Sequence, residues 1–359
     1  MMTLTTRKTE NGFVSIIAAT TIMILVSLIV IGFSVLMQRE QRQSLDRQLS
    51  TQAYYAAETG VNDVYQLLRD NPDSIPLEKN ECDVSDPTEP WNDGVISGTG
   101  DNAEVVSYSC LRYDRTPVDL VFTDTLTATS GSKIFPIESV NSGEGVDDVT
   151  FSWNGSGGTA NYDGSSSSCN NNLPRTFASN RVPLLRVDII EAPAAPAAGF
   201  TRQTLIDRTA SLYLYPRNSS CANGNSTINF DNYIGANKGQ VINTPCNASG
   251  CEITIDLPNQ NRYFARVKSV YQDVGTLNVV ATGTNPASGT FQFKDAQTIV
   301  DSTGKANDVL RRIEVRISND PQYNFPEGVI ESSEGFCKLI SIVPDPTSPI
   351  VDNENCYTP

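Results

Sequence analysis

An uncharged stretch near the amino terminus constrains this chain more than any other feature. Residues 13–37 form a run of 25 without Asp, Glu, Lys or Arg. A helix rises about 1.5 Å per residue, so this run is long enough to cross the roughly 30 Å hydrocarbon core of a bilayer. Gln38, Arg39 and Glu40 follow directly, in place of the small residues of a signal-peptidase site. We therefore expect a retained transmembrane helix over 13–37, preceded by a leader over 1–12.

The helical pattern continues beyond the uncharged run. Apolar or small residues recur at spacings of three and four, with polar residues between them, which is typical of a helix with one apolar stripe. They are Leu45, Leu49, Ala53, Ala56, Gly60, Val61, Val64, Leu67 and Leu68. The first strong helix breaker is Asn71-Pro72. The sequence therefore predicts one helix over 13–70, roughly 87 Å long at 1.5 Å per residue, with 38–70 as the amphipathic continuation of the span.

Composition excludes several functions. The chain has 359 residues, no histidine and a formal net charge of −15. Without imidazole there is no Ser-His-Asp or Cys-His catalysis, and we expect neither an enzyme nor a cofactor. The acidic balance disfavours broad binding of nucleic acid, which requires a basic surface. Basic residues do gather between 262 and 319, but Arg312, Glu314 and Arg316 alternate on one strand face, where ion pairs are the ordinary explanation.

Residues 71–359 are predicted to form a β-rich head. Apolar residues alternate with polar ones in many segments bounded by Gly, Asn, Pro or Ser, as in half-buried strands. The alternating sets include Val149/Phe151/Trp153, Leu185/Val187/Ile189, Leu212/Leu214, Ile253/Ile255/Leu257, Leu277/Val279/Ala281, Phe291/Phe293 and Ile313/Val315/Ile317. The Ala- and Pro-rich segment 192–199 is either a surface loop or a linker that divides the head.

The fold class we expect is α+β. A long amino-terminal helix packs on a large antiparallel, disulfide-braced head. The most regular part, 262–319, is predicted to be an antiparallel meander that covers the helical stripe between Ala53 and Leu68, since an uncovered stripe would leave an apolar patch. Asp301-Ser302-Thr303-Gly304 is predicted to be a solvated turn.

All eight cysteines lie between Cys82 and Cys356. Disulfides persist outside the reducing cytosol, so this distribution places the head outside the cytoplasm. The absence of CxxC and of histidine argues against a metal site. Spacing favours near-sequence pairs, although other connectivities stay open: Cys246–Cys251, Cys337–Cys356, Cys82–Cys110 and Cys169–Cys221.

The amino-terminal 70 residues resemble the type IV pilin superfamily. The resemblance rests on the basic leader ending in Gly12-Phe13, the helix that outlasts the membrane, and Tyr54-Tyr55-Ala56-Ala57-Glu58-Thr59-Gly60, which is similar to the AAE-x-G stretch of minor pilins and pseudopilins of the PilX and GspK kind. It implies cleavage between Gly12 and Phe13 by a prepilin peptidase and methylation of the new Phe13 amine. It further implies assembly by a platform protein and a cytoplasmic ATPase.

The chain departs from the family pattern at Ile17. Most pilins have a glutamate at the fifth mature position, where it neutralises a neighbouring subunit's ammonium, and residues 13–37 hold no acid. In the family this lack is associated with subunits at the filament tip. The other interpretation is that Ile17 is an ordinary apolar residue of a filament that manages without the acid.

Small residues offer a second assembly feature. Ala56, Ala57 and Gly60, together with Glu58 of the same motif, are candidates for close packing against neighbouring helices. Alanine is also simply a good helix former, whereas Gly60 costs about 1 kcal/mol in a helix without such a reason.

The expected function is therefore a structural one. The favoured hypothesis is a minor pilin that tips or primes a filament, residing in the cytoplasmic membrane before assembly and at the cell surface afterwards. Its partners would be other pilin subunits, the prepilin peptidase, the assembly machinery and a host or cell-surface ligand. The alternatives are a membrane-anchored adhesin that never polymerises and a major pilin.

Overall fold

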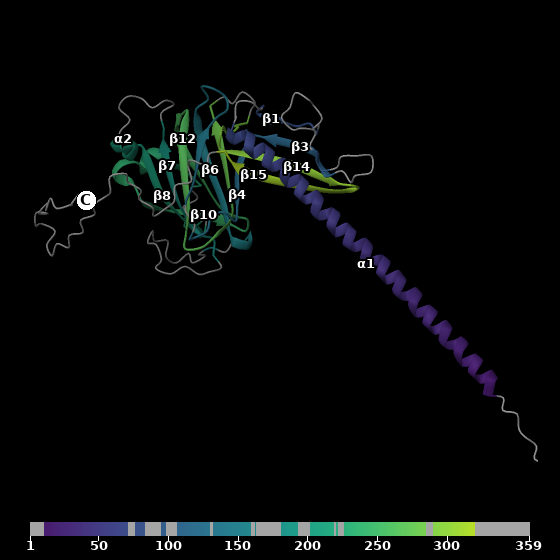
Figure 1. Cartoon of the computed structure of the whole chain (residues 1–359). Coiled ribbons are helices and arrows are strands. Elements are labelled where there is room, and N and C mark those ends of the chain that lie inside the picture. Colours follow the sequence, from purple (N-terminus) through teal and green to yellow (C-terminus); the bar gives the residue numbers. More distant parts are fainter. Residues whose placement is uncertain are drawn as a thin grey trace, which may run out of the picture. The chain divides into compact units, whose positions relative to one another are not determined.

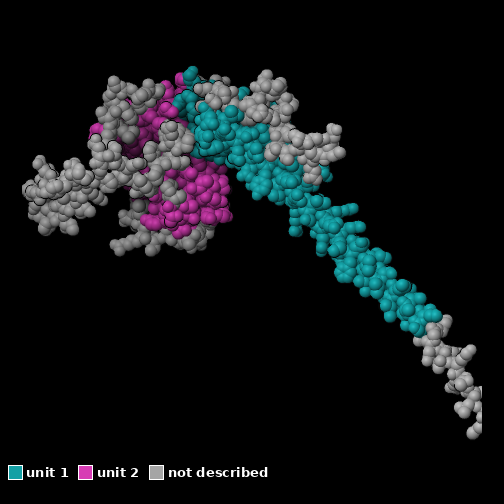
Figure 2. All heavy atoms as spheres, in the orientation of Figure 1, with its two compact units in different colours: residues 1–120, 138–142, 287–319 teal, residues 121–137, 143–286, 320–359 magenta. Residues whose placement is uncertain are grey.

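The computed structural model describes residues 11–70, 76–82, 95–97, 106–129, 132–158, 162, 181–192, 202–218, 220–221, 226–284 and 290–319 (Figure 1). The chain divides into two compact units (Figure 2). Unit 1 consists of Met1–Leu120, Glu138–Ser142 and Ala287–Asn319, and unit 2 of Val121–Ile137, Gly143–Pro286 and Asp320–Pro359. The helix and the last two strands thus share a unit although more than 200 residues separate them in sequence.

Unit 1 begins with one unbroken helix. Helix α1 spans Asn11–Asp70, 60 residues. It ends immediately before Asn71-Pro72, where the sequence places the breaker, because the residue before a proline is disfavoured in helical conformation. The predicted continuous helix is confirmed, and it starts two residues earlier than expected.

A five-stranded antiparallel sheet completes unit 1. The strand order is β1-β3-β14-β15, and β2 pairs with β3. The strands are β1 (Glu78–Lys79), β2 (Val95–Ser97), β3 (Val106–Asp114), β14 (Gln297–Ala306) and β15 (Val309–Ser318). Strand β14 lies at the centre and pairs along its whole length with the hairpin partner β15.

Unit 2 is built on a ten-stranded sheet of order β4-β13-β6-β11-β10-β8-β7-β12-β5, with β9 paired to β11. The strands are β4 (Asp119–Thr123), β5 (Lys133–Glu138), β6 (Val146–Gly155), β7 (Leu184–Glu191), β8 (Thr209–Asn218), β9 (Thr227–Asn229), β10 (Gln240–Asn247), β11 (Gly250–Gln260), β12 (Arg262–Val270) and β13 (Val274–Gly283), with a short helix α2 (Arg202–Asp207). The pairs β8–β10 and β9–β11 are parallel. The α+β layout is as expected, but the expectation of a purely antiparallel head is corrected to a mixed sheet.

The inner face of this sheet forms the core of unit 2. Ile253, Phe151 and Val279 lie side by side on β11, β6 and β13, and all three are fully buried. The outward neighbours in these strands are polar except for Val280, which is exposed, and this is the alternation that the sequence predicted. Phe291 and Phe293 are the exception: both are buried, but they lie in a segment that makes only an isolated bridge rather than a strand.

The predicted meander over 262–319 is wrong. Strands β12 and β13 are consecutive in sequence but not neighbours in the sheet: β12 lies between β7 and β5, and β13 between β6 and β4. Only β14 and β15 form the expected hairpin, and they belong to the other sheet. Arg266 and Lys268 therefore lie on β12 of the ten-stranded sheet, whereas Arg311, Arg312 and Arg316 lie on β15 of the five-stranded sheet.

The segment 192–199 does not coincide with a boundary between the units. Strands β7 and β8, which flank it, pair with each other from Leu185↔Leu214 to Ile190↔Thr209. This connection therefore joins two adjacent strands of one sheet.

Candidate assembly surface on the amino-terminal helix

The described side chains in the first half of α1 are exposed. Every side chain from residue 15 to residue 48 is exposed, including large apolar ones such as Met23, Ile31 and Phe33. The segment is long and apolar enough to cross a membrane. The hydroxyls of Thr20, Thr21 and Ser27 donate to backbone carbonyls one turn earlier at 2.8–3.1 Å. These polar side chains are thus satisfied within the helix, as lipid requires.

The predicted cleavage junction lies in the first turn of α1. Gly12 and Phe13 have helical backbone, and the Phe13 side chain lies outside the described part of the chain. Ile17, at the position of the missing acid, is about half exposed at 48%. Among the residues that the structure describes, none of the unit 1 sheet lies against this end of the helix (Figure 2).

The second half of α1 is covered on one side by the sheet of unit 1 (Figure 1). Val61 and Val64 pack in a cluster with Tyr108, Leu111 and Val300, and this cluster is buried. Ala53, Ala56 and Ala57 are at most 1% exposed. The predicted cover of the stripe is thus present, and it is supplied by β3, β14 and β15.

Two glycines bring the helix and sheet into close contact. A Cβ at Gly304 of β14 would overlap the Ala53 carbonyl oxygen and the Ala57 backbone nitrogen of α1. A Cβ at Gly60 would lie 2.5 Å from the Ser302 Oγ and 3.2 Å from the Tyr108 ring. Both positions lack a side chain because backbone and side-chain atoms of the other element occupy the space.

Polar contacts secure the same interface. The Tyr108 hydroxyl donates to the Asp63 carboxylate at 2.8 Å, and the Arg311 Nε donates to the Ser50 Oγ at 2.8 Å. Burial, together with the hydrogen bond to Asp63, raises the pKa of Tyr108 well above its ordinary value. The phenol therefore remains a donor throughout the physiological range.

The predicted assembly residues fall into two groups. Ala56, Ala57 and Gly60 are buried against the chain's own strands, and this intrachain packing accounts for the small residues of the motif. Glu58, in contrast, is exposed on the other side of the helix beside Tyr54 and Tyr55. Between residues 53 and 64, only this outer side is open to a neighbouring helix.

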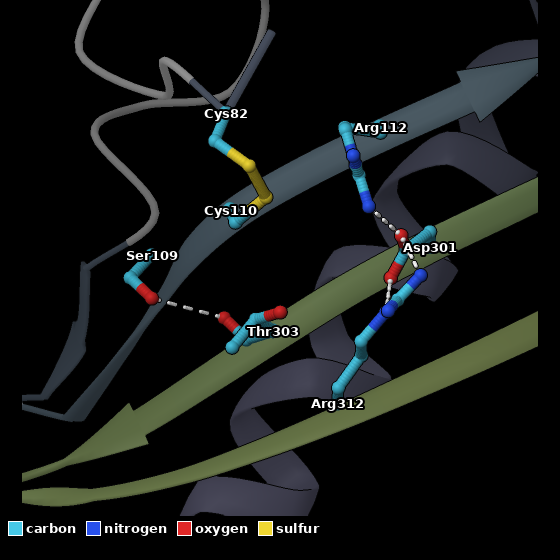
Figure 3. The surroundings of a disulfide bond; sticks show 7 residues. All are labelled: Cys82, Ser109, Cys110, Arg112, Asp301, Thr303 and Arg312. Carbon is cyan, nitrogen blue, oxygen red and sulfur yellow. Dashed lines mark hydrogen bonds and ion pairs between the residues drawn. A yellow bond between two sulfur atoms is a disulfide. The ribbon is translucent and has the colours of Figure 1, made fainter. Parts of the chain in front are cut away.

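The face of the unit 1 sheet that points away from α1 carries an ion-pair cluster (Figure 3). Asp301 accepts hydrogen bonds from the Arg312 Nε and Nη2 at 2.7 Å each and from the Arg112 Nη2. Burial alone would raise the pKa of Asp301, but the hydrogen bonds from Arg312 and Arg112 outweigh it, so the pKa lies below its ordinary value. The expected ion pairing of Arg312 is confirmed.

The prediction of a solvated turn at Asp301-Ser302-Thr303-Gly304 is wrong. All four residues lie within β14, and Asp301 and Ser302 are buried. Their polar composition is typical of a turn, but the residues make specific contacts within the sheet. Asp301 binds two arginines, and Gly304 allows the backbone of α1 to lie directly on β14. A glycine inside a strand can indicate close backbone approach, and that was the signal available for Gly304.

Two predicted disulfides are present. Cys82 is bonded to Cys110 on β3 (Figure 3), and Cys246 to Cys251 across the β10–β11 hairpin. Cys221 is disulfide-bonded. Its predicted partner Cys169 lies outside the described residues, as do Cys337 and Cys356. Among the described residues, no group of three or more His, Cys, Asp or Glu side chains is arranged to hold a metal.

Comparison of the chain with models of known protein families, with curated proteins and with solved structures gives no match.

Proposed function

We propose that this protein is a structural subunit of a type IV pilus or a related filament, and that it acts as a minor pilin at the tip or in priming. The proposal rests on the difference between the two halves of α1. One continuous helix has an exposed apolar half and a half covered by the sheet of its own unit. The sequence around Gly12-Phe13 and the motif ending in Gly60 support the same assignment.

A plain anchor does not account for this helix. About 20 apolar residues are enough to span a bilayer, whereas α1 continues without a break to Asp70. An unbroken helix holds the sheet of unit 1 rigidly to the span, which an anchor for a surface domain does not need. A subunit that leaves the bilayer and packs against other helices does need it, because the sheet must keep a fixed position in the filament.

The absence of an acid near the helix start supports a minor role. An ammonium buried among apolar helices is costly unless a carboxylate neutralises it. Ile17 supplies none, and neither does any residue of 13–37. A subunit at the filament tip has no other subunit ahead of it, so it has no neighbouring ammonium to neutralise. Maturation by a prepilin peptidase and transfer into the filament by a platform protein and ATPase belong to this proposal.

Deletion of the gene tests the priming role. Surface filaments should be lost or strongly reduced, and they should return on complementation with the wild-type chain. Filaments in normal number without the protein would overturn priming. Immunogold labelling of the head then separates the positions: label at filament ends supports a tip subunit, and label along the shaft supports a major or interspersed one. Label confined to the cell envelope would favour the non-polymerising adhesin.

A further inference from the structure

Unit 2 carries a small pocket on the outer face of its sheet, and none of its lining residues belongs to α1. It has a volume of about 180 Å³ and lies over β6, β11 and β13 and beside the turn of the β10–β11 hairpin. Its polar lining residues include Ser152, Asn154, Asn247, Ser249, Glu252 and Asn278. This volume is below the 300–1,000 Å³ or so of drug-sized sites and suits one small ring.

The floor of the pocket is a row across three strands. Glu252, Ser152 and Asn278 are direct neighbours on β11, β6 and β13. The Ser152 Oγ donates to the Glu252 Oε2 at 2.8 Å, which fixes the carboxylate and leaves its other oxygen as an acceptor. The Asn278 Oδ1 is covered and has no donor. A carbonyl oxygen that is covered and has no donor is unfavourable by about 1–3 kcal/mol.

The rim of the pocket offers hydrogen-bond donors. The Asn154 Oδ1 accepts from the Thr276 backbone N–H at 2.8 Å, and the Asn247 Oδ1 accepts from that of Ser249 at 2.7 Å. Both oxygens are thus engaged by backbone, and the Nδ2 end of each amide remains to donate. These donors are held in place: Cys246–Cys251 clamps the hairpin that carries Asn247, and a Cβ at Gly250 would overlap the Trp153 carbonyl oxygen.

This arrangement selects the chemistry of its ligand. No Lys or Arg lines the pocket, and Glu252 repels anions. A Ca²⁺ ion is a poor fit, since it takes about six to eight oxygen ligands and Glu252 is the one carboxylate among the lining residues. Amide donors next to a carboxylate acceptor match ligand groups that can both accept and donate hydrogen bonds. Hydroxyl groups have this property. An extended peptide would instead pair with a sheet edge, and this pocket lies on a sheet face.

We infer that this pocket, defined by Glu252, Ser152, Asn278, Asn154 and Asn247, binds a neutral saccharide residue through its hydroxyl groups. The Glu252 carboxylate accepts from ligand hydroxyls, and the asparagine amides donate to hydroxyl and ring oxygens. The inference does not depend on filament assembly, because it concerns unit 2 alone. It gives the head a ligand class that holds equally for a tip subunit and for a plain surface adhesin.

Titration of the full chain with simple sugars tests this inference. The protein is purified in a detergent without a sugar headgroup, and binding is followed by saturation-transfer NMR with methyl glucoside, galactoside, mannoside and N-acetylglucosaminide. Methyl glucuronide is the matched probe, because it differs from the glucoside by a carboxylate. At least one neutral glycoside should bind, and the glucuronide should bind about tenfold more weakly or not at all, since Glu252 opposes it.

Variants of the pocket residues show whether the glycoside binds in this pocket. Glu252→Gln and Asn278→Leu should each weaken binding of the neutral glycoside at least about tenfold, through loss of hydrogen bonds to the ligand. Asp231→Asn, which changes an exposed acid elsewhere in unit 2, should leave it unchanged. Circular dichroism shows that each variant is folded. The inference is overturned if no neutral glycoside binds, or if the two pocket variants bind as well as Asp231→Asn.

Discussion

Gly304 of β14 faces the Ala53 carbonyl oxygen of α1 so closely that no side chain fits between them. This contact joins residues about 250 positions apart in the sequence. It places the middle of the helix directly on the sheet, and the buried alanines 53, 56 and 57 are the consequence on the helix side. The orientation of α1 relative to its sheet, and hence of the exposed apolar half, depends on this contact.

Gly304→Ala is therefore expected to destabilise unit 1 by about 1–3 kcal/mol, as overpacking does. Circular dichroism at 222 nm during urea unfolding measures the loss. Thr303→Ala is the matched control, because it changes the neighbouring residue of the same strand on the opposite face. Equal stability of the two variants would mean that helix and sheet are not in this close contact.

Tyr108→Phe should remove the hydrogen bond to Asp63 with little change in packing. We expect a loss of about 1.5–3 kcal/mol in the free energy of unfolding, because the acceptor is charged. The double variant with Asp63→Asn should cost less than the sum of the two single changes, since both remove one interaction. Strict additivity in this cycle would speak against the bond.

The Asp301 cluster predicts a pH dependence in acid. The folded-state pKa of Asp301 lies below its ordinary value, so the ionised form is favoured in the folded chain. Its contribution to stability is complete above the unfolded pKa, near 3.8, and is lost as the pH falls through the folded value. Asp301→Asn should lack this part of the acid destabilisation, whereas Asp308→Asn, which changes an exposed acid at the β14–β15 turn, should retain it. Parallel pH–stability curves for Asp301→Asn and the wild type would contradict the assignment.

The two described disulfides should contribute unequally. Cys82–Cys110 closes a sequence separation of 28 residues and Cys246–Cys251 one of 5. If the chain-entropy model holds, the paired serine substitutions should cost about 3.6 and about 2 kcal/mol, respectively. Thermal unfolding of the two double variants measures the order. A reversed order would show that packing around the hairpin, rather than loop closure, dominates.

Much of the local structure could be predicted because it depends on local signals. The helix end at Asp70 follows from Asn71-Pro72, and the strand around Phe151 from strict alternation. The short pairs Cys82–Cys110 and Cys246–Cys251 follow from sequence proximity. None of these requires knowledge of which distant segment lies alongside.

Strand partners could not be predicted in the same way. Alternation identifies a strand but does not identify its neighbour. The sequence therefore predicts that β12 and β13 pair with each other, whereas each of them lies between two other strands. The segment around Asp301 has turn-like composition, and its burial depends on Arg112 and Arg312 from two other strands. Asn278 gives no signal in the sequence at all, since its pocket exists only once β6, β11 and β13 are aligned.

The mass of the mature amino-terminal peptide tests the proposed function most directly. Filaments are sheared from cells, the protein is isolated, and its amino-terminal peptide is identified by mass spectrometry. The account predicts a chain that begins at Phe13 with a methylated amine, and a Gly12→Val variant that retains its leader and is absent from filaments. A protein that is exported, bears its disulfides and still begins at Met1 or Met2 would contradict it.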